Sequence, residues 1–307
     1  MNTIKKWILA TRLETGTLAI TSVALGSALA AFVGAFNKHV ALLAALTAAL
    51  LQLVCNLAND YGDWVRGADP INDIKLPSAI QTGLVTLEQA KRALWVLTIL
   101  ALASGVSLLY VAQLSLTELG SFLLLGVLAL VAAITYTMGH RPYGYDGWGD
   151  VAVFVFFGLV GVGGTFYLHT KQLSTFWLLP AISHGSLVVG VLNINNLRDI
   201  APDAQAGKRT LAVQWGQKSI IRYHWLLLII SLGAALAFWG IHAQTRWPYG
   251  VLLVSAYLLS QHGLAVSRAV SEQLNQQLQH LVLLIMLLAC CWIFMLRYEA
   301  MSALWGH

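Results

Sequence analysis

Long apolar stretches separated by short polar ones run along almost the whole chain. Each is roughly 20 residues long, the length that an α-helix needs to cross the hydrocarbon core of a bilayer. The pattern predicts nine transmembrane helices in a single domain over residues 1–307, at residues 15–36, 40–58, 93–113, 117–138, 151–169, 174–194, 223–242, 247–267 and 279–298. We therefore expect an all-α integral membrane protein.

Composition agrees with this expectation. The 307 residues are 58% hydrophobic and only 10% charged, with a mean hydropathy of +0.71. The net charge of +5 fits contact with anionic lipid head groups. It does not indicate nucleic acid, because no basic run is interleaved with aromatic residues. Residues 1–14 lack a small-residue cleavage site after a short apolar core, so we expect a retained helix there and not a signal peptide.

The distribution of basic residues predicts the orientation of the helices. With the amino terminus in the cytoplasm, four cations lie outside, namely Lys38, Lys171, Arg246 and Arg297, and fourteen lie inside: Lys5, Lys6, Arg12, Arg66, Lys75, Lys91, Arg92, Arg141, Arg198, Lys208, Arg209, Lys218, Arg222 and Arg268. Such an excess is the positive-inside pattern. We expect a bacterial inner membrane protein whose polar site faces the cytoplasm.

Two acidic clusters stand out in a chain with so little charge. The first contains Asn56, Asn59, Asp60, Asp63 and Asp69, and the second contains Asn195, Asp199 and Asp203. A carboxylate beside a hydrocarbon-rich segment is costly unless it is paired, bound to metal or hydrated. Both clusters follow helices that end on the cytoplasmic side. We therefore expect them to line one central cavity open to that side.

The spacing within each cluster fits a metal site. Residues four apart share a helix face, which pairs Asn59 with Asp63 and predicts a continuous helical ladder through Asn195, Asp199 and Asp203. Carboxylate and amide oxygens suit Mg²⁺, which also keeps waters and binds phosphate oxygens. The alternative is that these side chains are polar helix ends that bind only backbone and water.

Cations and aromatic rings occur near the acidic clusters. Lys208 and Arg209 follow Asp203 directly and could hold a diphosphate, although cytoplasmic cations commonly serve topology alone. Arg141 lies in a segment with three tyrosines, whose rings could stabilise a carbocation or stack on an aromatic molecule: Tyr136, Tyr143 and Tyr145. Interfacial Tyr residues are also ordinary in membrane proteins.

These motifs resemble the UbiA superfamily of intramembrane aromatic prenyltransferases. The resemblance covers nearly the whole chain and is carried by NLANDYGDWVRGAD (56–69), AAITYTMGHRPYGYDGWGD (132–150) and VLNINNLRDIAPDAQAGKRTLAV (191–213). The three segments are most similar to those of members that prenylate 1,4-dihydroxy-2-naphthoate. Members acting on 4-hydroxybenzoate or haem usually carry a Tyr-Pro-x-x-Lys-Arg-type sequence after the fourth helix, which this chain lacks.

The resemblance implies a fold, a reaction and roles for residues. It implies a nine-helix UbiA-type bundle that transfers a polyprenyl group from a polyprenyl diphosphate to 1,4-dihydroxy-2-naphthoate, with loss of diphosphate and CO₂, giving demethylmenaquinol. It implies Mg²⁺ held by Asn59, Asp60, Asp63, Asn195, Asp199 and Asp203. The catalytic residues would be Asp63, Asp199, Lys208, Arg209 and Arg141, and the substrate contacts Arg12, Asn56, Tyr136, Arg141, Tyr143, Tyr145, Lys208 and Arg209.

The chain departs from the family pattern at three places. Gly67 stands where relatives often have a third aspartate, with Asp69 two residues on; Arg12-Leu13 replaces an Arg-Pro pair; and Lys75 replaces an arginine. Three other functions stay open from the residues: another aromatic acceptor, a secondary transporter and a non-catalytic scaffold. A transporter would more often hold its carboxylates near the bilayer midplane.

Overall fold

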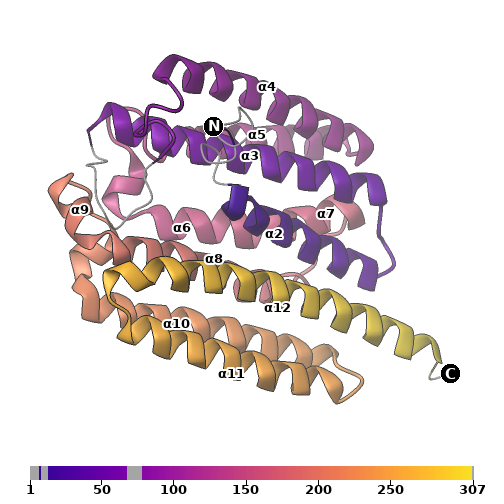
Figure 1. Cartoon of the computed structure of the whole chain (residues 1–307). Helices are drawn as coiled ribbons and strands as arrows, with labels where there is room; N and C mark the ends of the chain where they lie inside the picture. The colour runs from indigo at the N-terminus through magenta and orange to yellow at the C-terminus, as the bar shows by residue number, and fades with distance from the viewer. Residues whose placement is uncertain (1–6, 8–12, 68–77, 306–307) are drawn as a thin grey trace.

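A computed structural model describes residues 7, 13–67 and 78–305, and this part of the chain is helical with connecting turns (Figure 1). Arg12, Asp69 and Lys75 lie outside the described residues. The elements are α2 (Leu13–Phe32), α3 (Lys38–Val65), α4 (Leu87–Val111), α5 (Leu116–Thr135), η1 (Tyr143–Asp146), α6 (Gly149–Val153), η2 (Phe154–Gly164), α7 (Thr165–Thr170), α8 (Leu178–Arg198), α9 (Ile200–Gln205), α10 (Leu211–His242), α11 (Trp247–Arg268) and α12 (Ser271–Trp305).

The predicted membrane architecture is confirmed. Within the described ranges, eight helical spans are long and apolar enough to cross a bilayer, and the apolar part of α2, Gly16–Phe32, is a shorter ninth. Each corresponds to one predicted span, with α6, η2 and α7 forming a single continuous span from Gly149 to Thr170. The protein is an integral membrane protein.

Several helices extend beyond the apolar stretch that predicted them. α3 continues to Val65, so Asn56, Asn59, Asp60 and Asp63 lie within its last turns instead of after it. α10 runs from Leu211 with a break in helical geometry at Gly216 (φ 75°, ψ 165°), so its continuous part begins just after Gly216 and not near residue 223, and α12 begins at Ser271. Polar residues can continue a helix outside the hydrocarbon region, where hydropathy no longer marks it. Capping boxes fix the N-termini of two helices, formed by Thr86 and Gln89 at α4 and by Ser115 and Glu118 at α5.

The span from Gly149 to Thr170 contains an unusual segment, because η2 is a π-helix of 11 residues. π-Helical geometry normally occurs as single turns. The residues of this span that line the large cavity between α2, α3, α4, α5, η2 and α8 recur at every fourth position in two rows: Ala152, Phe156, Val160, Gly164 and Leu168, and beside them Val153, Phe157, Gly161 and Thr165. A pure α-helix with 3.6 residues per turn would rotate such rows away from the cavity. The wider π turns rotate such rows in the opposite direction and so offset the drift.

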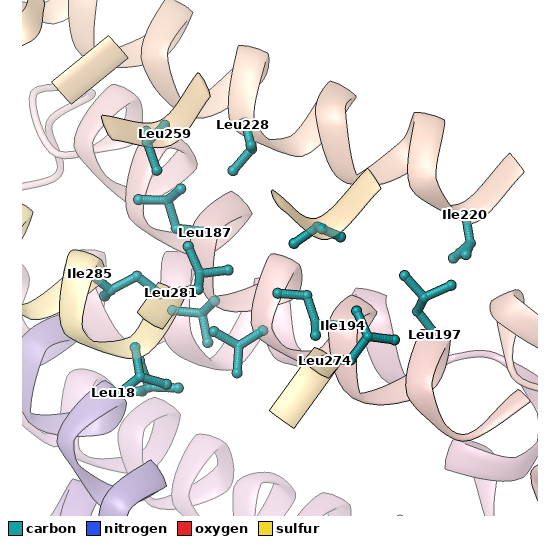
Figure 2. Packing of buried hydrophobic residues seen from close by; sticks show 14 of the residues in the cluster. Leu18, Leu187, Ile194, Leu197, Ile220, Leu228, Leu259, Leu274, Leu281 and Ile285 are labelled. Atoms are coloured by element: carbon teal, nitrogen blue, oxygen red, sulfur yellow. The ribbon is translucent and has the colours of Figure 1, made fainter. Parts of the chain in front are cut away.

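The helices pack around α8, most of whose apolar stretch is buried. α8 lies against α10, α12 and η2, while α3 packs against α4 and α2. Figure 2 shows the largest part of the core, where leucine and isoleucine side chains of α2, α8, α10, α11 and α12 meet: Leu18, Leu187, Ile194, Leu197, Ile220, Leu228, Leu259, Leu274, Leu281 and Ile285. This packing fixes α8, and with it the second acidic motif, against the rest of the bundle.

Candidate functional site

A cavity of about 500 Å³ lies between α2, α3, α4, α5, η2 and α8. One end is polar and is lined by both acidic motifs: Asn56, Asn59, Asp60, Asp63, Asn195, Asp199 and Asp203. The rest of the wall is mainly apolar, with side chains such as Leu109, Phe122, Phe156 and Leu168. The structure thus brings together every predicted metal ligand at one end of a long apolar pocket.

The first motif is fixed by the end of α3 and by the segment that follows α5. Thr137 donates hydrogen bonds to the carbonyl of Ala58, at 3.1 Å, and to Oδ1 of Asn59, at 3.3 Å. Gly62 permits this contact, since a Cβ there would lie 2.7 Å from the Thr137 hydroxyl. Asp60 and Asp63 are both buried. The local packing therefore orients this wall before any ligand binds.

The second motif is not the continuous helical ladder that its spacing predicts. α8 ends at Arg198, and Asp199 has φ −99° and ψ 15°, outside helical geometry, before α9 begins at Ile200. The backbone N–H of Asp203 still donates to the carbonyl of Asp199, at 2.8 Å. The prediction of one uninterrupted helix face was therefore wrong, although Asn195, Asp199 and Asp203 all reach the same cavity.

Lys208 joins the two motifs. Its Nζ donates to Oδ2 of Asp63 at 2.9 Å and lies 3.8 Å from Oδ1 of Asp203. The three side chains are almost enclosed, with 11 to 13% of each exposed. Its ammonium group therefore sits between carboxylates from opposite sides of the cavity. Lys208 is one of the two cations that the sequence predicts to hold a diphosphate.

Tyr145 is the second connection at this end of the cavity. Its hydroxyl donates to Oδ1 of Asp63 at 2.7 Å, and its ring lies 4.8 Å from Nζ of Lys208 and 5.5 Å from the guanidinium carbon of Arg66. Burial and the neighbouring charge of Asp63 raise the pKa of Tyr145, so the phenol stays protonated and remains a donor. The sequence predicts that Tyr145 contacts a substrate, and the structure joins its hydroxyl to the carboxylate of Asp63.

The remaining predicted residues divide into two groups. Tyr136 and Tyr143 line the cavity with their rings edge to face, 5.3 Å between centroids, and the Tyr143 hydroxyl donates to the carbonyl of Ala132 at 3.0 Å. Arg141 and Arg209 are exposed and are not part of the cavity wall. Arg209 contributes backbone contacts instead, since its N–H donates to the carbonyl of Tyr145 at 2.6 Å.

Sequence reasoning assigned no role at the site to Arg66, Thr137 or Arg198. Thr137 and Arg66 support the wall around Asn59 and Tyr145, and Arg198 binds Asp199 directly. The sequence alone predicts Arg66 and Arg198 only as cations on the cytoplasmic side. The available signal was their position, because each stands within three residues of a predicted ligand.

The donor set fits Mg²⁺. Among the described residues, no three Asp, Glu, His or Cys side chains converge on one metal position. Carboxylates interspersed with asparagine oxygens are nevertheless what Mg²⁺ uses when waters and phosphate oxygens complete its shell. The ammonium of Lys208 already occupies the space between Asp63 and Asp203, so this position favours positive charge. Asn59 and Asp63 on one side and Asp199 and Asp203 with Asn195 on the other would hold the ion.

Comparison with known proteins agrees with this geometry. The sequence profile of the UbiA prenyltransferase family matches residues 19–277. The chain belongs to this family. A relative named 1,4-dihydroxy-2-naphthoate octaprenyltransferase from Escherichia coli (strain K12) is 44% identical over 255 residues, 83% of either protein. One with the same name from Haemophilus influenzae is 43% identical over 265 residues, 86% of either protein.

Solved structures of other UbiA proteins share the fold. A UbiA homolog from Archaeoglobus fulgidus bound to GPP and Mg²⁺ matches with a TM-score of 0.68 at 13% identity, covering 96% of this chain and 99% of that one. A UbiA homolog from Aeropyrum pernix K1 matches with a TM-score of 0.66 at 16% identity, covering 90% and 98%. At this identity the likeness concerns the fold alone.

Proposed function

We propose that this protein transfers a polyprenyl group from a polyprenyl diphosphate to 1,4-dihydroxy-2-naphthoate, with Mg²⁺ as its metal. The observation that carries the proposal is the meeting of both acidic motifs and Lys208 at the polar end of a long apolar cavity. The polar end suits a metal-bound diphosphate and the apolar wall suits a prenyl chain. The names of the relatives from Escherichia coli and Haemophilus influenzae support the choice of acceptor.

The chemistry needs little more than positioning and charge. Mg²⁺ held by Asp63, Asp199 and Asp203 would supply positive charge against the diphosphate when the allylic C–O bond breaks. Lys208, between Asp63 and Asp203, adds a cation at the same place, and Tyr145 keeps Asp63 oriented. The apolar wall excludes water, which would otherwise capture the allylic cation.

The acceptor ring then forms a C–C bond at the carbon that bears its carboxylate. Loss of CO₂ returns the electron pair of the breaking C–C bond to the ring and restores its aromaticity, giving demethylmenaquinol. The CO₂ leaves in place of a ring proton, so the chain does not have to remove a proton at this carbon. This accounts for a site built from metal ligands, cations and aromatic rings without requiring a general base.

The orientation in the membrane is part of the proposal. The positive-inside bias supports an orientation in which the ends of α3 and α8 face the cytoplasm of a bacterial cell, from which the naphthoate and Mg²⁺ would enter. The apolar wall runs from there toward the other membrane surface. The prenyl diphosphate would therefore enter with its head at the cytoplasmic end and its chain among the helices.

Incorporation of labelled prenyl diphosphate by membranes containing this chain tests the proposal. We expect prenylated product with 1,4-dihydroxy-2-naphthoate and not with 4-hydroxybenzoate or haem, and no product after chelation of Mg²⁺. Asp63→Ala or Asp203→Ala should lower turnover more than tenfold, about 1.4 kcal/mol of transition-state stabilisation. The exposed Asp146 on the same side provides the control, and Asp146→Ala should keep full activity. Product with 4-hydroxybenzoate alone would overturn the choice of acceptor.

A further inference from the structure

The break between α8 and α9 leaves Asp199 without the side-chain direction that a helix would give it. Its carboxylate is nevertheless held at both oxygens by the preceding residue. Nε of Arg198 donates to Oδ1 at 2.7 Å and Nη2 donates to Oδ2 at 2.6 Å. Both side chains are 7% exposed. The orientation of Asp199 is thus set by a two-point ion pair and not by helix geometry.

The same guanidinium contacts two asparagines. Its Nη2 donates to Oδ1 of Asn195 at 2.7 Å, and its Nη1 donates to Oδ1 of Asn275 at 2.6 Å. Asn195 and Asp199 line the cavity, while Arg198 and Asn275 do not. Asn275 belongs to α12, so the guanidinium connects the second acidic motif with the last helix of the bundle.

We propose that Arg198 is a positioning residue for the metal and diphosphate site, a proposal that rests on the function proposed above. Its planar guanidinium fixes the Asp199 carboxylate and the Asn195 amide at the cavity wall, and Asn275 holds the guanidinium from behind. Groups that bind metal ligands from outside the cavity orient those ligands and tune their affinity. A lysine cannot reproduce the contact, because its ammonium lacks the fork that reaches both carboxylate oxygens.

The geometry separates this role from direct substrate binding. Arg198 is buried behind the cavity wall, and its four donated hydrogen bonds are directed to Asp199, Asn195 and Asn275. The geometry also gives no reason to assign the pair a purely stabilising role. A buried ion pair is often no more stabilising than apolar residues of the same volume, because burial of its charges is costly.

Binding of Mn²⁺ to the purified full-length protein, followed by electron paramagnetic resonance with a non-reactive prenyl thiolodiphosphate present, tests the proposal. We expect Arg198→Lys and Arg198→Gln to weaken Mn²⁺ binding by about 10- to 100-fold, the usual effect of losing a partner of a metal ligand. Asn275→Ala should weaken it in the same direction by a smaller factor. Arg268→Gln is the matched control, since Arg268 is an exposed arginine at the end of α11.

The melting temperature, measured on the same samples, separates positioning from stability. If Arg198 had a purely structural role, its substitution would lower the melting temperature while Mn²⁺ binding to the folded protein stayed within twofold of wild type. This result in both Arg198→Lys and Asn275→Ala would overturn the proposal. Weaker Mn²⁺ binding in both variants, with the control unchanged, supports it. Absence of Mn²⁺ binding in the wild type would overturn the proposed metal and this inference together, whereas equal binding in all proteins would overturn this inference alone.

Discussion

Lys208 combines two roles that the sequence could not separate. The sequence predicts Lys208 both as a cytoplasmic cation that contributes to topology and, as a neighbour of Asp203, as a cation for a diphosphate. The structure places its ammonium 2.9 Å from Asp63 and 3.8 Å from Asp203, inside the cavity wall. Arg209, the next residue, is exposed. The two adjacent cations therefore differ in position, and we expect them to differ in importance.

Lys208→Ala should weaken use of the prenyl diphosphate whatever the acceptor. Loss of a charge-assisted contact of this kind costs roughly 1 to 3 kcal/mol. Steady-state kinetics with both substrates varied would show a lower kcat/KM for the diphosphate substrate. Lys218→Ala removes an exposed lysine on the same side and should leave kcat/KM unchanged for both substrates. A rise confined to the KM of the acceptor would assign Lys208 to the other half of the site.

Tyr145→Phe should also act through the diphosphate, because the hydroxyl that it removes donates to Asp63. A hydrogen bond to a charged group contributes about 1.5 to 3 kcal/mol, so we expect kcat/KM for the prenyl diphosphate to fall at least tenfold. Tyr257→Phe, on an exposed tyrosine of α11, is the control. If only the acceptor's KM rose, Tyr145 would belong to the acceptor's half of the site.

The candidate site was largely predictable at the residue scale because carboxylates are rare in so apolar a chain. Asp60, Asp63, Asp199 and Asp203 stand out for that reason, and all four reach the cavity. Arg198 was not predictable in the same way. An arginine at the end of a membrane helix usually contributes only to membrane topology. The structure shows that α8 ends at Arg198 and that its side chain binds the carboxylate of the next residue, Asp199.

At the scale of elements, hydropathy predicted where helices cross the membrane but not how they are wound. The segment FVFFGLVGVGG, residues 154–164, is uniformly apolar, so no periodicity distinguishes a π-helix from an α-helix within it. Three of its four glycines bring the backbone close to neighbours: Gly158 to α8, Gly161 to Ser22 and Gly163 to Trp177. These long-range contacts are absent from the local pattern that a sequence prediction uses.

The fourth glycine of η2 offers a way to test the apolar wall. A Cβ at Gly164 would meet nothing nearer than Cγ1 of Val160, at 3.8 Å, whereas a Cβ at Gly161 would lie 2.7 Å from Cβ of Ser22. Gly164→Leu should therefore fold normally and reduce turnover of long prenyl diphosphates more than of short ones.

Gly161→Leu is the comparison variant, and it should lose about 1 to 3 kcal/mol of stability through overpacking. Thermal unfolding and turnover with a series of prenyl diphosphates would measure both effects. Equal loss of turnover for short and long donors in Gly164→Leu would contradict a prenyl chain lying along this wall.

For the whole molecule, alternation of the spans decides which loops share a side. Lys208 contacts Asp63, so the ends of α3 and α9 lie at the same end of the bundle. In a protein whose native cysteines are replaced, a cysteine at Gln205 should react with an impermeant thiol reagent only from the cytoplasm. A cysteine at Gln172, between α7 and α8, should react only from outside; both positions are exposed. Labelling of both from one side would contradict the nine-span topology.

The contact of Lys208 with Asp63 and Asp203 also affects whether the protein stays folded when no metal ion is bound. Small metal-dependent domains lose their structure when the ion is removed, since their ligands then have no counter-charge. Here the chain carries its own counter-ion, which holds the two acidic segments together through an ammonium group. A chelator should therefore stop turnover and leave the melting temperature in detergent nearly unchanged. If so, we expect the ion to bind and leave together with each diphosphate, and the protein without ligands to stay folded without it.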